Sequence, residues 1–324
     1  DFLDLLQPYV GHMQMPTRLI DPKYRHLNHL SFFEYIDKYL LHDPALIQAI
    51  DYQMMDDYGA NCSRVSALAG IHYYSCRDYY GESKPELFSP PEGNHYFIKK
   101  LINGQNKEQL KASTMAFHIE RKNNLYHTKL FHTQTEKVET VVSKNILYAG
   151  QKNALKFIYP AHYPLFAHTE YSAWVAINFE LKQSIPGQVK WQNDILGVNK
   201  NLMGFVNAQT QHKENKILTM YMCFDPEERK KMPKIMANPK DIVNQAVCFL
   251  NQYFNTSAQD YIKSAHIKVM GHAMPVPEKG HLFNDRNLQT QKENFYFAGV
   301  DNGRLPLMFE AMDSGIYAAN LINN

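Results

Sequence analysis

The C-terminal stretch from Asn294 to Asn324 changes its hydrophobic period half-way, and this change constrains the fold more than any other feature. Four apolar residues, Phe295 to Ala298, run into Gly299, which predicts a short buried strand that ends in a tight turn. From Leu307 the apolar residues recur about every 3.6 positions, and Pro306 suits the first position of a helix. The chain is therefore predicted to end in a strand, a turn and a helix.

The predicted helix has one face of small and apolar residues, which we expect to be buried. The expected buried positions are Met308, Met312, Gly315, Ala319 and Ile322, and the expected outer positions are Glu310, Asp313 and Asn320.

A turn between a strand and a helix can bind a ligand. The free N–H groups and the positive dipole end at the helix start favour an anionic or electron-rich group. Gly299 would let the backbone approach that group closely, and Asp301 is placed to accept hydrogen bonds from ligand hydroxyls or backbone amides. An ordinary strand–helix unit that closes a sheet would show the same pattern, so the ligand is a hypothesis at this point.

These residues resemble the C-terminal flavin-binding signature of the FAD-dependent amine oxidase superfamily. Phe297-Ala298-Gly299-Val300-Asp301 is similar to the start of that signature, and Glu310 to Ala319 is similar to its end, with Glu310 in place of the usual Gly. The resemblance implies an α+β chain, the C-terminal two-thirds of an α/β flavoprotein, with an amine-oxidase-like fold of two interleaved domains. It implies FAD as the cofactor, bound by Gly93, Gly299, Asp301, Leu307, Met308 and Phe309.

The N-terminal part is predicted to be helical after an irregular start. Ser31 can cap a helix and Glu34 completes a capping box. Asp43-Pro44 begins a second helix, and residues 63–74 form a third. Residues 31–80 resemble the helical insert of polyamine-oxidising relatives, closest to bacterial spermidine-dehydrogenase-like flavoproteins.

Strands dominate the middle of the chain. Residues 87–94 resemble the family's proline-rich turn that re-enters the flavin domain, and a helix follows over 95–101. The predicted strands are 110–119, 126–133, 137–142, 145–149, 174–181, 203–209, 217–224 and 267–270, with a long amphipathic helix over 239–253.

The resemblance implies two domains built from alternating pieces of chain. Residues 1–90 and 151–285 are expected to form the substrate domain, a helical insert plus a mixed sheet. Residues 91–150 and 286–324 are expected to form the later parts of the FAD-binding domain. Such interleaving favours a ligand site at the domain interface.

Flavin-dependent amine oxidation needs little acid–base machinery, because the flavin takes the hydride and the protein positions the substrate in a dry aromatic cavity. Lys156 lies near the position where many amine oxidases carry a lysine that holds water at the flavin N5. His272 follows a predicted strand and could orient substrate or act as a base. Both residues also have an alternative without a catalytic role: Lys156 as a surface lysine, and His272 as a histidine that is hydrogen-bonded to the backbone of a turn. Candidates for the substrate wall are Tyr73, Tyr74, Tyr171, Trp174 and Met274.

Composition and motifs exclude several other functions. The net charge of +2 and the scattered lysines give no case for a nucleic-acid partner. Apolar runs such as 172–179 stop short of the roughly 18 residues of a membrane span. The four cysteines lack metal-ligand spacing, and the sequence has no HExxH pair, P-loop or GxSxG elbow. We expect no metal.

The chain also lacks a GxGxxG turn, which a flavoprotein of this type needs to hold the FAD pyrophosphate. The N-terminal FAD-binding segment is therefore expected to lie outside this chain. The compartment stays open between bacterial cytoplasm and periplasm.

The predicted function is oxidation of a C–N bond in a polyamine-like amine by hydride transfer to FAD. One alternative is a flavin-dependent C–C desaturase or protoporphyrinogen-oxidase-like enzyme. Another is a non-catalytic binding or structural fragment without its nucleotide-binding half. A polyamine tunnel should present carboxylates, whereas a desaturase tunnel should be wide and hydrophobic, without acidic residues.

Overall fold

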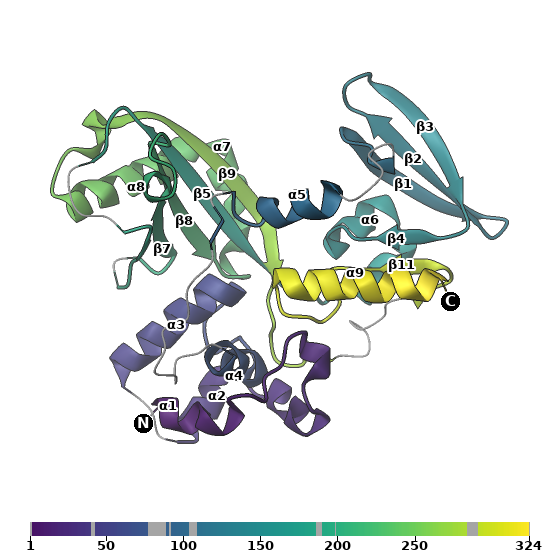
Figure 1. The fold of residues 1–324 in the computed structure, drawn as a ribbon, viewed down its shortest axis with the longest axis horizontal. Helices are drawn as coiled ribbons and strands as arrows, with labels where there is room; N and C mark the ends of the chain where they lie inside the picture. The colour runs from purple at the N-terminus through teal and green to yellow at the C-terminus, as the bar shows by residue number, and fades with distance from the viewer. Residues whose placement is uncertain are drawn as a thin grey trace. The chain divides into compact units, whose positions relative to one another are not determined.

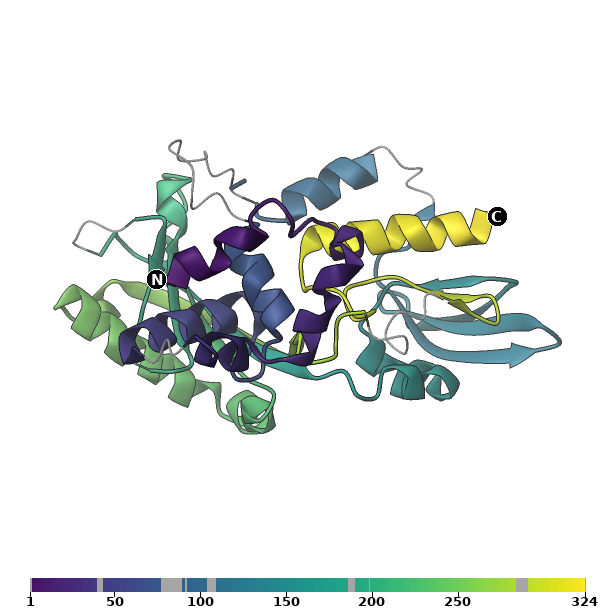
Figure 2. The ribbon, with the colours of Figure 1, turned by 90° about the horizontal axis from the view of Figure 1, so that it is seen from below.

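The computed structural model describes residues 2–39, 43–76, 89–90, 92–103, 109–185, 190–197, 199–283 and 291–323. These residues form two compact units whose pieces alternate along the chain. Unit 1 comprises Asp1–Leu30, Ser66–Thr169 and Pro277–Asn324, and unit 2 comprises Ser31–Val65 and Glu170–Val276. The elements of both units are drawn in Figures 1 and 2.

Unit 2 is built on a five-stranded antiparallel sheet with the strand order β6-β7-β8-β5-β9. Its strands are β5 (Tyr171–Leu181), β6 (Gln192–Asp194), β7 (Leu202–Asn207), β8 (Ile217–Phe224) and β9 (Ile262–Pro275). Its α-helices are α2 (Phe32–Asp37), α3 (Pro44–Tyr58), α7 (Met232–Ala237) and α8 (Pro239–Phe254).

The core of unit 2 lies between this sheet and α8 (Figure 1). Val175, Ile177 and Phe179 of β5 point to this core, because alternate residues of a strand share one face. Helix α8 contributes an apolar stripe that includes Ile242 and Leu250, as its helical period predicts.

The end of α8 is less buried than its middle: Tyr253 is 47% exposed, and its ring packs edge-on against Phe205 at 5.1 Å. The strand predicted over 267–270 extends over all of β9, because it pairs along the whole length of β5. The capping box is confirmed: Ser31 Oγ accepts the Glu34 N–H, and Glu34 accepts the Ser31 N–H.

Gly204 of β7 is a site where a side chain cannot fit. Its φ is +148°, and an added Cβ would lie 2.2 Å from the Asn193 carbonyl oxygen of β6. We expect Gly204→Ala to destabilise the protein by about 2–4 kcal/mol, because backbone strain and a steric clash add. Gly271→Ala in β9, where nothing lies within 4 Å, should change stability by less than about 0.5 kcal/mol. Urea unfolding measures both, and equal effects would contradict the prediction.

Unit 1 contains two small sheets and several helices. The antiparallel sheet is β1 (Thr114–Lys122), β2 (Leu125–His132) and β3 (Lys137–Ser143); the second is β10 (Gln291–Lys292), β11 (Phe295–Phe297) and β4 (Ile146–Tyr148). Its α-helices are α1 (Phe2–Leu6), α4 (Ala67–Ser75), α5 (His95–Asn103), α6 (Leu155–Ile158) and α9 (Met308–Asn323).

Strands β4 and β11 pair in parallel, with Ile146 opposite Phe295 and Tyr148 opposite Phe297. Aromatic side chains form the core beside this pair, where Tyr159 stacks on Phe295 at 5.3 Å. The predicted strand, turn and helix at the end of the chain are confirmed, with the helix beginning at Met308. The parallel pairing brings the segments after both strands to the same edge.

Residues 2–30, 66–76 and 151–169, which were expected in the substrate domain, pack within unit 1. Their backbone hydrogen bonds explain this grouping: the Ser66 N–H donates to Pro277 O, and the Gly280 N–H donates to Asn28 O. The assignment of substrate and FAD-binding domains stays a prediction. The part of the proline-rich turn at 87, 88 and 91 lies outside the described residues.

Candidate functional site

The carboxyl ends of β4 and β11 form the first candidate site. The Ala298 N–H donates to Tyr148 O at 3.0 Å, so the segments that follow β4 and β11 leave the sheet side by side. Ligands of sheets with parallel strands bind outside these carboxyl ends, where the loops can carry polar groups. The loop after β11 runs through Gly299 and Asp301, the residues that the sequence singled out.

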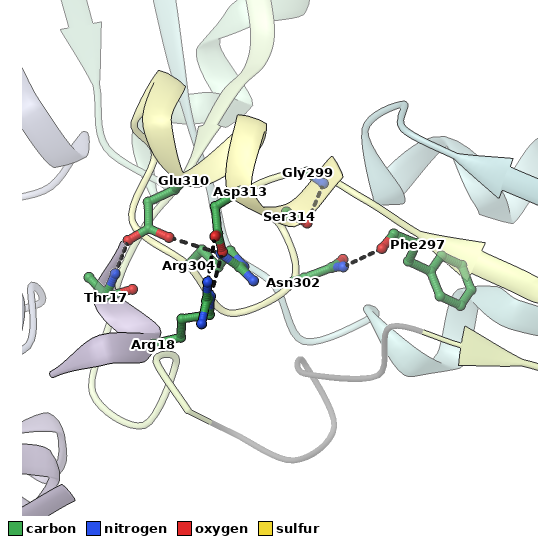
Figure 3. A network of polar contacts seen from close by, with 9 residues as sticks. All are labelled: Thr17, Arg18, Phe297, Gly299, Asn302, Arg304, Glu310, Asp313 and Ser314. Carbon is green, nitrogen blue, oxygen red and sulfur yellow. Dashed lines mark hydrogen bonds and ion pairs between the residues drawn. The ribbon is translucent and has the colours of Figure 1, made fainter. Parts of the chain in front are cut away.

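Gly299 allows the loop to turn between the strand and α9. Its φ is +119°, a conformation that side chains rarely adopt, and an added Cβ would lie 3.2 Å from Lys152 Nζ. The Gly299 N–H donates to Ser314 Oγ at 3.0 Å, which ties the turn to the buried face of α9 (Figure 3).

Asp301 of this turn and Lys152, which follows β4, form a buried pair. Asp301 is 5% exposed, and its Oδ2 accepts the Lys152 N–H at 3.1 Å. The Lys152 side chain is fully buried, and its Nζ donates to the carbonyls of Ala298 and Gly150. Burial lowers the pKa of Lys152 to about 8, against the opposing effect of Asp301.

Sequence reasoning missed Lys152 and weighed Lys156 instead. Lys156 is exposed, with its Nζ 4.9 Å from the centre of the Phe157 ring. A signal for Lys152 exists in its position, since it follows the predicted strand 145–149 by three residues and thus stands at the carboxyl edge of the sheet. The water-holding role of Lys156 stays a prediction.

Asn302 completes the turn. Its Nδ2 donates to Phe297 O at 3.0 Å (Figure 3), and the residue is 1% exposed. Its Oδ1 is buried and has no hydrogen-bond partner among the described residues. A buried acceptor of this kind calls for a donor.

The start of α9 is held by a network of charges (Figure 3). Arg304 is 7% exposed, and its Nη1 contacts Glu310 Oε2 at 3.2 Å and Asp313 Oδ2 at 2.6 Å. Arg18 pairs with Asp313 through two bonds of 2.9 Å, and Thr17 donates its N–H to Glu310 Oε1 at 2.6 Å. Hydrogen bonds from Arg18 first, and from Arg304, lower the pKa of Asp313 despite its burial.

Because of this network, the buried face of α9 differs from the face predicted from the sequence. Glu310 was expected outside but is fully buried, and Ser314 and Ala318 continue the buried face. The reason is that Arg304 and the Thr17 N–H satisfy the carboxylate, so its burial is compensated. The five positions expected on the buried face, Met308, Met312, Gly315, Ala319 and Ile322, are partly exposed.

The remaining predicted cofactor residues lie around the start of α9, apart from Gly93. Leu307 and Met308 are partly exposed and Phe309 is 64% exposed. The N–H groups of Met308 and Phe309 have no hydrogen-bond partner among the described residues, as is usual in the first turn of a helix. Gly93 lies in a turn with φ +57°, and its N–H donates to Pro90 O.

The residues of this turn fit a flavin nucleotide. Asp301 supplies a carboxylate, Asn302 supplies an orphaned acceptor, and the first turn of α9 supplies free N–H groups. Hydroxyl groups donate to the first two, and an electron-rich ring edge or phosphate accepts from the third.

The predicted substrate residues fall in both units. Tyr73 and Tyr74 belong to α4 of unit 1, where their rings meet edge to face at 4.8 Å. Tyr171, Trp174 and Met274 belong to unit 2. The aromatic wall predicted from the sequence is therefore divided between the units, and its role in binding stays a prediction.

His272 of β9 lies beside Arg229 and Tyr171. Arg229 Nη1 contacts His272 Nε2 at 2.7 Å, and the His272 ring meets the Tyr171 ring edge to face at 5.4 Å. Because a guanidinium can only donate, His272 Nε2 accepts this hydrogen bond. Proton transfer to Nε2 would require this bond to break, and the role of His272 as a base stays a prediction.

Trp174 lies on the sheet face opposite the α8 core. It packs with Tyr52, Met55, Met203 and Cys223, and stacks on a tyrosine of β8. The Trp174 indole N–H is buried without a hydrogen-bond partner among the described residues. Sequence reasoning singled out Trp174 but not the α3 residues that surround it.

A cavity of about 630 Å³ within unit 2 is the second candidate site, and its size suits a small organic molecule. It lies between α3 and the segments that flank β7 and β8. Its lining is largely apolar, with three carboxylates and one lysine. The carboxylates are Asp51, Asp225 and Glu228, and the lysine is Lys200.

The three carboxylates differ in their surroundings. Glu228 is already compensated by Lys200 at 3.0 Å, by Lys231 and by Asn201. Asp51 accepts the Cys62 N–H at 2.9 Å but has no cationic partner in the described part of the chain. Asp51 can therefore bind a positive charge that enters the cavity.

No group of three or more His, Cys, Asp or Glu side chains among the described residues could hold a metal ion. In the same part of the chain, no helix has the length and apolar character needed to cross a bilayer.

No protein-family model matches the sequence, and no curated protein matches it. Solved structures do. Cyclohexylamine oxidase from Brevibacterium oxydans IH-35A has a TM-score of 0.60 and 14% identity, over 100% of this chain and 74% of that chain. A putrescine oxidase triple mutant with redesigned cofactor binding has a TM-score of 0.65 and 11% identity, over 99% of this chain and 74% of that chain. This chain has the fold of these two oxidases.

Proposed function

We propose that the protein is a FAD-dependent oxidoreductase that oxidises a carbon–nitrogen bond of an amine. The observation that carries the proposal is the Gly299–Asp301 turn at the carboxyl ends of two parallel strands. The fold likeness to two amine-oxidising enzymes along nearly the whole chain supports it. So does the agreement between that turn and the flavin-binding signature.

The turn would hold FAD through three kinds of contact. Asp301 would accept hydrogen bonds from hydroxyl groups, and Asn302 Oδ1 would accept another. The free N–H groups of Met308 and Phe309, with the helix dipole behind them, would face an electron-rich ring edge. Bound FAD would supply the hydride acceptor for the reaction. Gly93 and Leu307 remain proposed contacts by resemblance.

The cavity of unit 2 favours an amine over the substrate of a C–C desaturase. An apolar wall with carboxylates suits a molecule that has an aliphatic body and an ammonium end. A desaturase substrate would meet Asp51 and Asp225 without a group to pair with them, at a cost in desolvation. We propose a polyamine-like amine as the substrate class.

Reconstitution tests this function. The purified full-length protein is incubated with FAD and passed through a desalting column, and the visible spectrum is recorded. We expect flavin bands to stay with the protein and to bleach anaerobically when spermidine, putrescine or cyclohexylamine is added. Retained flavin that no amine reduces would favour the desaturase alternative, and a colourless protein would favour a non-catalytic fragment.

Removing the uncompensated carboxylate of the cavity should weaken amine binding. In Asp51→Asn the amide oxygen can still accept the Cys62 N–H, so the fold is kept while the charge is lost. We expect KM for a cationic amine to rise about tenfold to a hundredfold with little change in kcat, since a hydrogen bond to a charged group contributes about 1.5–3 kcal/mol. Asp241→Asn, on exposed α8 surface, is the matched control. An unchanged KM would show that the amine binds elsewhere.

A further inference from the structure

Lys152 ties together the ends of the two parallel strands. Its Nζ donates to Gly150 O after β4 at 3.2 Å and to Ala298 O after β11. Its backbone N–H donates to the Asp301 carboxylate. One residue therefore connects both strand ends and the acidic residue of the turn.

Besides its two carbonyl acceptors, the buried ammonium of Lys152 has aromatic rings as neighbours. Its Nζ is 5.5 Å from the centre of the Tyr148 ring and 5.9 Å from that of Phe166, and the side chain is fully buried. In such a medium a charge acts on its neighbours far more strongly than in water. The ammonium also lies close to the turn, because a Cβ added to Gly299 would be 3.2 Å from Lys152 Nζ.

Two other titratable groups lie near the pair, and burial shifts the pKa of each of them away from pH 8. Burial raises the pKa of the Tyr148 phenol to about 12, and burial lowers the pKa of His281, which interacts with Asp301 and His168, to about 4. Asp301 is the anionic neighbour of Lys152, and it keeps part of the lysine protonated against the effect of burial. The local charge of the turn thus depends on Lys152.

We propose that the buried ammonium of Lys152 is a positioning charge for an anionic cofactor at the Gly299–Asp301 turn. It holds the two strand ends in place and offsets the negative charge of Asp301, which would otherwise act on the anionic cofactor without compensation. The inference rests on the proposed function, because FAD is the ligand. The inference goes beyond the proposed function, because it makes the affinity for the cofactor depend on the protonation of one buried lysine.

The pH dependence follows from linkage. An anionic ligand favours protonated Lys152, so FAD affinity should be highest below the pKa of this lysine and should fall as the pH rises through about 8. The stability of the FAD-free protein should change in the opposite direction. Since the folded-state pKa is lower than the unfolded value, stability should rise between about pH 8 and pH 10.

The test compares wild type, Lys152→Met, Lys152→Arg and the exposed-lysine control Lys144→Met. FAD dissociation constants are measured by quenching of flavin fluorescence at about pH 7 and about pH 9.5, and the FAD-free proteins are melted at both values. In wild type and Lys144→Met we expect affinity to weaken about tenfold at the higher pH. In Lys152→Met we expect it to be about tenfold weaker at pH 7 and independent of pH. Lys152→Arg should bind at both values, because arginine stays charged.

Wild-type affinity and pH profile in a folded Lys152→Met would overturn the inference while leaving the proposed function intact. If Lys152→Met does not fold, the comparison of wild type with Lys152→Arg decides, and equal pH profiles overturn the inference. Absence of FAD binding in wild type at either pH would remove the proposed function and this inference together. The melting curves report how the protonation of Lys152 affects stability in the absence of FAD.

Discussion

Asp301→Ala is expected to release FAD, with affinity reduced about a hundredfold, because a hydrogen bond to a charged group contributes up to about 3 kcal/mol. The carboxylate is 5% exposed and is held by the Lys152 N–H at 3.1 Å, so it is aimed before any ligand arrives. Such preorganisation makes its contribution to binding large. The measurement is flavin retention after desalting, followed by a fluorescence titration with FAD.

Two controls separate lost binding from lost structure. Asp301→Asn keeps an oxygen that can accept both the Lys152 N–H and a ligand hydroxyl, and it should retain more FAD than Asp301→Ala. Circular dichroism should show that both variants are folded. Full flavin retention by a folded Asp301→Ala would mean that the turn does not contact the cofactor and that the resemblance to the flavin-binding signature is misleading.

Arg304→Met is expected to lower the free energy of unfolding by about 3–5 kcal/mol, the usual cost of breaking a buried ion pair from one side. The Arg304 side chain is 8% exposed, and it pairs with Glu310, whose side chain is fully buried, and with Asp313. Without the guanidinium, Glu310 would keep the Thr17 N–H but lose its compensating charge. Urea unfolding of the FAD-free protein measures the change.

The exposed partner of the same network is the matched control. Arg18 is 51% exposed in its ion pair with Asp313, so Arg18→Met should cost less than about 1 kcal/mol. Adding Glu310→Gln to Arg304→Met should recover part of the loss, because it removes the uncompensated charge. Similar costs for Arg18→Met and Arg304→Met would contradict the view that burial sets the energy of this network.

Local sequence pattern was enough to predict the main elements. The strand before Gly299, helix α9, the capping box at Ser31 and helix α8 were all predicted, because hydrophobic period and capping chemistry act over a few neighbouring residues. Gly299 and Asp301 were singled out for the same reason. Their position at the end of a strand and before a helix is visible in the sequence alone.

The partners of these residues were decided only by the tertiary structure. Glu310 is buried because Thr17, 293 positions earlier, and Arg304 satisfy its carboxylate, although its place on the helix predicts exposure. Lys152 contacts the Gly299–Asp301 turn because β4 and β11, nearly 150 positions apart, pair in parallel. Local periodicity carries no information about such contacts. The stability of a buried charge depends on groups that only folding brings within hydrogen-bond distance.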